Sequence, residues 1–490
     1  MRLRPPRRQP TAPSAGAEPT DRPAVGLAFA AIVLAMLPGV LDQTILATAL
    51  PTVARELGTL SDVSWVVTAY VVAAAATTPL WGKLGDRHGR KRLLEISLVV
   101  FVGASALCGA AQDITQLIVL RLVQGAAAGG LMTLAMATVG DLVAPRERGR
   151  YQGYIAATFA VATIVGPLIG GTLVDHASWR WVFFVNLPLG IVALAGLHLR
   201  VPAAPARRPE HPLDVAGGAL LAAATSAFLL TCIWGGSRYA WGSLEIAGLI
   251  GATVALSLAL LYRERRAADP IVPFAMLHTP AVAVASGTLF LATAALFAIT
   301  VFVPLFLQTT TGASPTEAGL LLVPAMLGIT ISTTLSGRSI ARTGRYKVFP
   351  VFGLALMTTA LVLLAALAAE PSQLATGVGL AVFGLGFGMV TQVLIVAVQN
   401  SVDRRQLGVA TAATGFFRAL GGAVGAAILG TVFAAHAGGE QTGGVASRAD
   451  VIDGVQTVFL VAAPLAALAL LLVLRLPEAP LQTRLATAKS

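Results

Sequence analysis

The sequence predicts an all-α polytopic membrane protein with fourteen transmembrane helices in an order of six, two and six. Hydrophobic residues make up 56% of the 490 positions and charged residues only 12%, which leaves too little polar surface for a water-soluble globule. Apolar runs of roughly 20 residues, each long enough to cross a hydrocarbon core of about 30 Å, recur along the chain. A set of loop and glycine positions also repeats at one fixed distance.

The repeat joins two loops and three glycines. The first loop, at 82–92, reads GKLGDRHGRKR, and a degraded copy at 337–347, 255 positions later, reads GRSIARTGRYK. At the same distance, three glycines of the first half precede three of the second: Gly153, Gly166 and Gly170, then Gly408, Gly421 and Gly425. Glycine suits a tight reversal between helices, and basic residues suit helix ends that meet the cytoplasm. We expect a duplicated transporter.

The predicted spans can be followed in order. Six lie in the first part of the chain, at 24–49, 63–81, 93–111, 114–139, 151–174 and 181–199. Proline-rich, charged stretches at 200–213 and 263–280 then interrupt the apolar pattern. Two spans, 214–234 and 243–262, lie between them, and six follow at 281–307, 317–337, 348–368, 372–399, 407–435 and 455–475. Because six is even, both halves enter and leave on one side of the membrane, so the repeat is parallel.

These breaks predict five regions. They are a disordered cytoplasmic tail at 1–23, an N-terminal six-helix bundle at 24–199, a linker with two extra transmembrane helices at 200–280, a C-terminal six-helix bundle at 281–475 and a cytoplasmic tail at 476–490. Most Lys and Arg fall in the segments that are then cytoplasmic, as the positive-inside rule requires. We expect a multi-pass protein of the cell membrane with both termini inside, whose net charge of +11 faces anionic lipids and not nucleic acid.

Five motifs in this order carry a family resemblance: LDQTILATALP from Leu41, the loop GKLGDRHGRKR, LRLVQGAAAGG from Leu120, GPLIGG from Gly166 and WRWVFFVNLPLG from Trp179. Together they resemble the fourteen-helix drug:proton antiporters of the major facilitator superfamily. The resemblance implies the major facilitator fold and proton-coupled export of lipophilic drugs by alternating access, with a small-molecule substrate and protons as partners of a monomer. Two positions depart from the pattern: Ala162 replaces a usual glycine, and Ala341 stands where the first loop has Asp86.

Three charged residues lie clearly within apolar spans, where an ionisable group costs several kcal/mol and is a functional candidate: Asp42, Arg121 and Arg418. Asp42 and Arg121 are each about seven residues from the outer end of their helices, so both lie roughly 10 Å deep. The resemblance implies that these two helices line one cavity. Burial disfavours an ionised carboxylate and a guanidinium favours it, so we expect Asp42 to carry the proton in competition with the drug. A permanent ion pair that only joins two helices is the alternative.

The expected substrate cavity contains Gln124, Gln392 and Arg418. Gln124 follows Arg121 by one turn and is equally suited to a helix–helix hydrogen bond. Arg418 lies near the midplane without an intramembrane carboxylate in its own half. Carbonyls freed by nearby glycines, Thr391 and Gln392, or an anionic part of the substrate are its candidate partners. Two buried arginines and one buried acid favour a neutral, anionic or monovalent lipophilic substrate over a dication.

The first loop contains the expected gating residues, Gly82, Asp86, Arg87, Gly89 and Arg90. A carboxylate here can cap a helix N-terminus or pair with a basic residue across the bundle interface, and release of that contact would open the inner gate. An ordinary solvated turn is the alternative.

The antiporter motif is expected at Gly166, Pro167, Gly170 and Gly171. Proline frees a backbone carbonyl and permits a kink, while glycines allow close helix approach. We expect a hinge or a sealed contact that prevents proton leak. Packing alone is the alternative.

The sequence lacks the residue patterns that other classes of function require. The sequence contains no phosphate-binding GxxxxGK[ST] loop, and its spans show no catalytic cluster, so neither an ATP-driven pump nor an enzyme is expected. Six histidines without ligand spacing and two cysteines within apolar spans predict no metal and no cofactor. Export of an endogenous metabolite or lipid, and uptake by proton symport, remain alternative functions.

Overall fold

The computed structural model describes residues 22–57, 60–202, 212–271, 274–311, 320–368, 372–436, 448–478 and 481. The tail expected at 1–23 lies outside the described residues up to residue 21, as does most of the tail expected at 476–490. Within the described ranges, thirteen helices are long and apolar enough to cross a membrane. The one predicted span not among these thirteen is the tenth, 317–337, which corresponds to α14 (Val323–Thr343). Its hydroxyl side chains and arginines lower its mean hydropathy, although it packs along α5 and α16. The all-α polytopic fold with fourteen transmembrane helices is confirmed.

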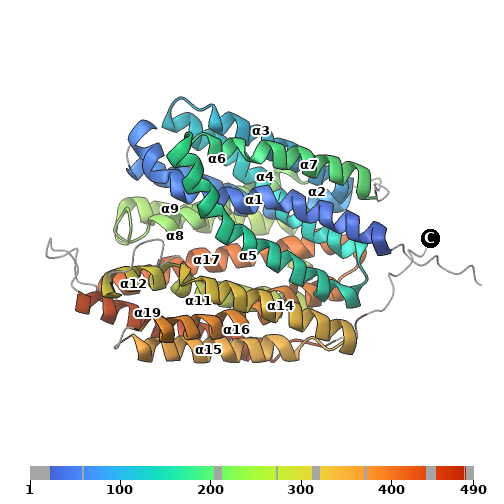
Figure 1. The fold of residues 1–490 in the computed structure, drawn as a ribbon. Helices are drawn as coiled ribbons and strands as arrows, with labels where there is room; N and C mark the ends of the chain where they lie inside the picture. Colours follow the sequence, from blue (N-terminus) through green and yellow to red (C-terminus); the bar gives the residue numbers. More distant parts are fainter. Residues whose placement is uncertain are drawn as a thin grey trace, which may run out of the picture.

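The N-terminal spans form one layered group of helices. They are α1 (Arg22–Leu57), α2 (Leu60–His88), α3 (Arg90–Gly109), α4 (Ile114–Leu142), α5 (Pro145–His176) and a sixth span made of α6 (Trp181–Phe184) and α7 (Asn186–Arg200). Local chemistry sets their ends. The Asp113 carboxylate accepts the Gln116 N–H at 2.8 Å and caps α4, and Pro145 opens α5, where no helical donor is lost. Figure 1 shows this group in blue to green above the C-terminal helices.

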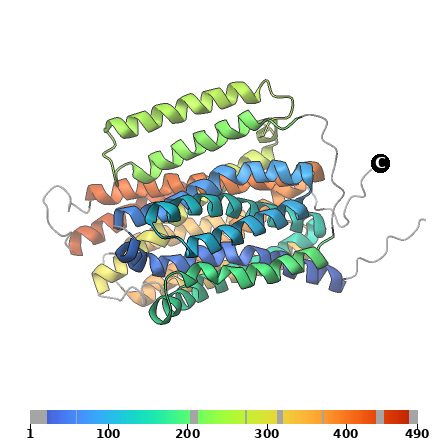
Figure 2. The ribbon, with the colours of Figure 1, turned by 90° about the horizontal axis from the view of Figure 1, so that it is seen from above.

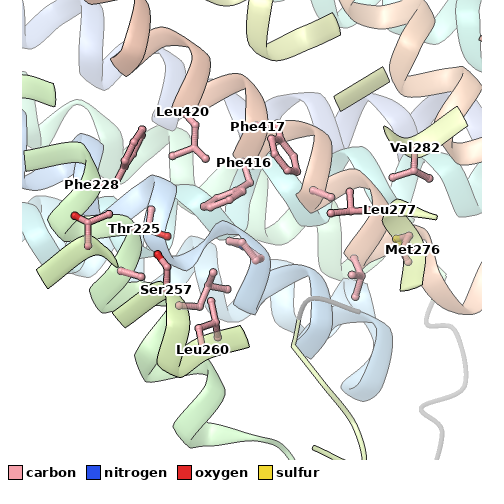
Figure 3. A pocket seen from close by; sticks show the side chains of 16 residues that line it. Thr225, Phe228, Ser257, Leu260, Met276, Leu277, Val282, Phe416, Phe417 and Leu420 are labelled. Atoms are coloured by element: carbon pink, nitrogen blue, oxygen red, sulfur yellow. The ribbon is translucent and has the colours of Figure 1, made fainter. Parts of the chain in front are cut away.

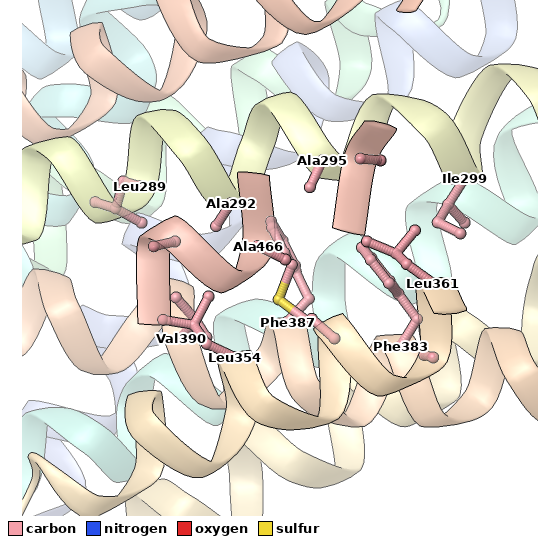
Figure 4. Packing of buried hydrophobic residues seen from close by; sticks show 14 of the residues in the cluster. Leu289, Ala292, Ala295, Ile299, Leu354, Leu361, Phe383, Phe387, Val390 and Ala466 are labelled. Atoms are coloured by element: carbon pink, nitrogen blue, oxygen red, sulfur yellow. The ribbon is translucent and has the colours of Figure 1, made fainter. Parts of the chain in front are cut away.

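The C-terminal helices repeat the arrangement. They are α11 (Pro280–Phe297), η1 (Ala298–Phe302) and α12 (Val303–Thr311), which together form one span, then α14, α15 (Val348–Leu367), α16 (Gln373–Ser401), η2 (Arg404–Gln406), α17 (Leu407–His436) and α19 (Arg448–Val473). Alanines of α11 allow α16 and α19 to approach closely, and α15 packs behind these two helices; Leu361, Phe383 and Phe387 belong to the same buried cluster (Figure 4). Such small residues let helices pack tightly where lipid offers no hydrophobic driving force.

The inserted segment forms two separate helices, α8 (Val215–Trp234) and α9 (Leu244–Glu264), followed by the short α10 (Phe274–Leu277). Asp214 and Ser243 cap their N-termini. Helix α8 packs against α2 of the N-terminal group and α17 of the C-terminal group, while α9 lies further out (Figure 2). The pair therefore covers one of the two seams between the halves.

Matched glycines show the sequence repeat in three dimensions. Gly89 ends α2 with a φ of 93°, and Gly344, 255 positions later, ends α14 with a φ of 74°. Only glycine adopts this conformation readily, so both loops can reverse the chain in one residue. We call the end of the molecule that carries Gly89, Gly344 and the N-termini of α5 and α17 the basic end.

Candidate transport site

A buried hydrogen-bonded network surrounds Asp42 in the N-terminal helices. Its Oδ2 accepts from Arg121 Nη1 at 2.5 Å, and its Oδ1 accepts from Gln124 Nε2 at 2.9 Å. Arg121 also donates to Gln124 Oε1 at 2.8 Å, and all three side chains are at most 1% exposed. Helices α1 and α4 meet here, but of the two only α4 supplies described lining residues to the central cavity, so the expectation that both line one cavity does not hold for the described wall. Within the described ranges, no three His, Cys, Asp or Glu side chains come together to hold a metal ion.

Four further residues extend the network. Asn186 at the start of α7 donates to Asp42 Oδ1 at 3.4 Å and to Ser105 Oγ at 3.0 Å. The Arg121 guanidinium lies 4.1 Å from the centre of the Tyr70 ring, and its Nε donates to the Val66 carbonyl at 3.3 Å. Our sequence reasoning missed these groups. Asn186 belongs to the motif WRWVFFVNLPLG and could have been found from it, whereas Tyr70 and Ser105 carry no distinguishing signal.

The antiporter motif lies against the helix that carries Asp42. A Cβ at Gly166 would come 2.0 Å from Thr44 Oγ1, and one at Gly170 would come 2.4 Å from Thr48 Oγ1 and 2.7 Å from the Ile45 carbonyl. These two glycines therefore permit direct contact between α5 and α1. Gly171 differs from this expectation, because a Cβ there would meet nothing within 4 Å.

Pro167 lies inside α5 between the contacts of Gly166 and Gly170. The second half repeats the two glycine contacts. Gly421 and Gly425 of α17 press in the same way on carbonyls of Phe290 and Ala294 in α11. In each half, a glycine pair thus lets one helix lie directly on the first helix of that half.

A central cavity of about 210 Å³ lies between the two halves. Its walls come from α4 and α5 on one side and from α11, α14, α16 and α17 on the other. Arg418 and Gln392, two of the three residues predicted for a substrate cavity, line it. Gln124 does not, because the structure encloses it in the Asp42 network. Seven threonines and an apolar surface of methionine, phenylalanine, leucine and isoleucine complete the described wall.

The cavity and the Asp42 network are separate but connected through packed side chains. Met132 lines the cavity, two turns beyond Gln124 on α4, which is roughly 12 Å along the helix. Its Cε lies 3.4 Å from the position that a Cβ at Gly39 would occupy. The Gly39 carbonyl in turn accepts the Tyr70 hydroxyl at 3.3 Å, and Tyr70 faces Arg121. A conformational change at the Asp42 network can therefore affect the central cavity through these packed side chains, and not by direct contact with a ligand there.

At the basic end, the first loop closes the seam between α2 and α17. The Asp86 carboxylate accepts the backbone N–H groups of Gly408 at 2.8 Å and Val409 at 2.9 Å, which caps α17, and it pairs with Arg90 at 2.5 Å. Gly82 allows this approach, because a Cβ there would come 2.7 Å from the Gly408 carbonyl. Of the two contacts considered for a gating carboxylate, the helix cap crosses the seam, whereas the basic partner Arg90 belongs to the same half as Asp86.

The other seam, between α5 and α14, is closed by a basic side chain at a helix C-terminus. Arg146, at the start of α5, donates to the carbonyls of Ala341 at 2.7 Å and Arg342 at 2.5 Å at the end of α14. A Cβ at Gly337 would come 2.0 Å from the Gly149 carbonyl, so the two helices touch there. One seam thus places an anion at a helix N-terminus, and the other places a cation at a helix C-terminus.

The inserted segment also contacts the gating loop. Asp269, after α9, forms ion pairs with Lys83 and with Arg87, the latter at 3.4 Å. Nothing in the sequence pattern indicated this contact.

A second cavity, of about 320 Å³, lies between the inserted helices and α2 with α17 (Figure 3). Phe228 and Leu260 bound it on the inserted pair, and Phe416 and Leu420 bound it on α17. Arg418, from the same helix, lines the central cavity instead, so α17 forms a wall common to both cavities.

Comparisons with known proteins agree with this architecture. Residues 32–426 match the family model described as Major Facilitator Superfamily. An uncharacterized MFS-type transporter of Mycobacterium tuberculosis is 41% identical over 86% of the chain, which spans 62% of that relative's length. The multidrug transporter protein MdtP of Bacillus subtilis is 34% identical over 85% of the chain and 76% of its own length. The proton:xylose symporter XylE has a similar fold, with a TM-score of 0.66 at 13% identity over 94% of this chain and 97% of its own.

Proposed function

The chain belongs to the major facilitator superfamily, and from this premise we propose that it is a proton-coupled exporter of lipophilic drugs or related small molecules. It is a membrane transporter and not an enzyme. The names of its relatives as multidrug transport and resistance proteins support drug export. The motifs and the fourteen helices support the drug:proton antiporter subfamily, with the basic end, both termini and the gating loop facing the cytoplasm.

The observation that carries proton coupling is the enclosed Asp42–Arg121 pair. An ionised Asp42 on α1 holds Arg121 and Gln124 on α4 and Asn186 on α7. Protonation removes the negative charge and weakens each of these charge-assisted bonds, which frees α1 from α4. Because Tyr70 and Met132 connect this network to the cavity wall, the proton and the drug compete through the conformation of α4 and not for one space.

The closed basic end supports an outward-facing conformation. The Asp86 cap on α17 and the Arg146 contacts on α14 each join one half to the other. Alternating access requires that both contacts break when the cavity opens to the cytoplasm. Protonation of Asp42 is the step that favours this opening, and drug loading followed by proton release favours the return.

The test is transport by Asp42→Asn in proteoliposomes with an imposed pH gradient. The amide keeps the size of the carboxyl group and cannot carry a proton. We expect gradient-driven drug accumulation to be lost, while exchange of labelled for unlabelled drug without a gradient continues. Full uphill transport by the variant would rule out the coupling role, and loss of exchange as well would indicate a structural ion pair.

Export of an endogenous lipid or metabolite would use the same apparatus, and uptake by symport would reverse its direction. A protonophore separates the directions in intact cells. It raises the cellular content of an exported dye and lowers that of an imported one.

A further inference from the structure

The central cavity contains one charged side chain among its described lining residues, Arg418. It has no hydrogen bond or ion pair with any described residue, and its side chain is exposed to the cavity that it lines. The other arginines buried in the described helices are bound. Arg121 holds Asp42, Arg90 holds Asp86 and Asp141, and Arg148 donates to three backbone carbonyls.

Because Arg418 is exposed to the cavity and has no partner among the described residues, its guanidinium is free to meet a ligand, and a charge at membrane depth is stabilised by an opposite charge. The cavity wall supplies none. Its threonines donate their hydroxyls to backbone carbonyls, as Thr330, Thr333 and Thr391 do, and no described Asp or Glu lines it. Gln392 lines the same cavity, and its Oε1 atom is buried without a hydrogen-bond partner, so it does not bind Arg418 either.

The remaining wall accommodates a lipophilic body. Met132, Met136, Phe159, Met326 and Phe387 face the cavity from both halves. Methionine and aromatic side chains adapt to many apolar shapes. The complementary ligand has one apolar body and one anionic group with several oxygens, which the fork of a guanidinium binds better than an ammonium does.

We propose that Arg418 is the substrate-recognition residue of this cavity and that the preferred substrates are lipophilic anions, such as sulfonates or carboxylates. The proposal rests on the transport function proposed above and names its substrate class. A lipophilic cation of equal size meets the same apolar wall, but it finds one positive charge and no described carboxylate to balance its own.

The test uses two probes with one body and opposite permanent charges, naphthalene-2-sulfonate and trimethyl(2-naphthylmethyl)ammonium. Neither is redistributed by a pH gradient alone. Gradient-driven uptake into proteoliposomes is compared for the wild type, Arg418→Met and Arg418→Lys. Arg266→Met, on an exposed arginine that is not among the described residues lining the central cavity, is the matched control.

We expect the wild type and the control to take up the sulfonate in preference to the ammonium. Arg418→Met loses two charge-assisted hydrogen bonds to the anion, so sulfonate uptake falls about tenfold or more while ammonium uptake does not fall. Arg418→Lys keeps the charge and part of the sulfonate preference. A wild type that prefers the ammonium, or an equal loss of both probes in Arg418→Met, would overturn the proposal.

Binding of the same probes to the purified protein separates this proposal from the transport function. If neither probe is transported but sulfonate binds and Arg418→Met weakens that binding about tenfold, the anion site stands and proton-driven export fails. If sulfonate binds equally to both proteins, Arg418 does not recognise the anion, whatever the transport result.

Discussion

The Asp42–Arg121 pair shows how much a single buried contact demands of the residues around it. Two charges removed from water are stable only if every remaining donor and acceptor is used, and here Gln124, Asn186 and the Val66 carbonyl supply those bonds. The pair itself was predictable, because Asp42 and Arg121 interrupt apolar runs. Its completing groups were not, because Tyr70 and Ser105 are ordinary residues of a span until the fold brings them to Arg121 and Asn186.

Replacing one member of the Asp42–Arg121 pair should therefore destabilise the protein more than replacing both. Arg121→Met leaves Asp42 buried without its counter-ion, and we expect a loss of about 3–5 kcal/mol of stability. The double variant Asp42→Asn with Arg121→Met should recover most of the melting temperature but none of the gradient-driven transport. Thermal unfolding in detergent measures the first effect and proteoliposome uptake the second. A double variant less stable than Arg121→Met alone would contradict this account.

At the scale of the elements, glycine determines which helices touch. Gly166 and Gly170 seat α5 on α1, and their repeat partners Gly421 and Gly425 seat α17 on α11. The sequence predicted close approach from the motif, but the direction of each glycine depends on how α5 is rotated. That rotation turns Gly171 away from α1, which no spacing rule revealed.

This difference gives a matched pair of variants. Gly170→Ala places a methyl group within 2.4 Å of Thr48 Oγ1, so we expect it to cost about 1–3 kcal/mol by overpacking. Gly171→Ala meets open space and gains helix propensity, so its stability should equal or exceed that of the wild type. The melting temperatures of the two purified variants, compared with that of the wild type, measure this difference in stability. Equal losses would mean that α5 is not held against α1 as described.

At the scale of the whole molecule, the two halves repeat in form and differ in chemistry. The duplication and the number of spans could be predicted, because topology preserves glycine framing and positive loops in both halves. The division into five regions stays a prediction. The replacement of Asp86 by Ala341 was visible in the sequence, but its counterpart was not: Arg146 reaches the α14 carbonyls only once α5 and α14 pack together. Likewise, Asp269 comes close to Lys83 only through the inserted helices.

Because the Asp86 cap joins the halves, its removal should shift the balance between conformations. An N-cap is worth about 1 kcal/mol, so Asp86→Ala should raise the population open at the basic end roughly fivefold. Thr414→Cys in the central cavity provides the readout, since the native Cys108 and Cys232 are buried. Labelling by an impermeant maleimide from the basic side should accelerate in Asp86→Ala. An unchanged labelling rate would show that this cap does not hold the seam closed.

The shared wall formed by α17 has a pharmacological consequence. A compound lodged behind this helix, between the inserted pair and α2, would touch both halves without entering the central cavity. Such an inhibitor would hold α2, α17 and the inserted pair together, and a higher concentration of a substrate of the central cavity would not displace it. Resistance arising from changes in the central cavity would leave its binding intact.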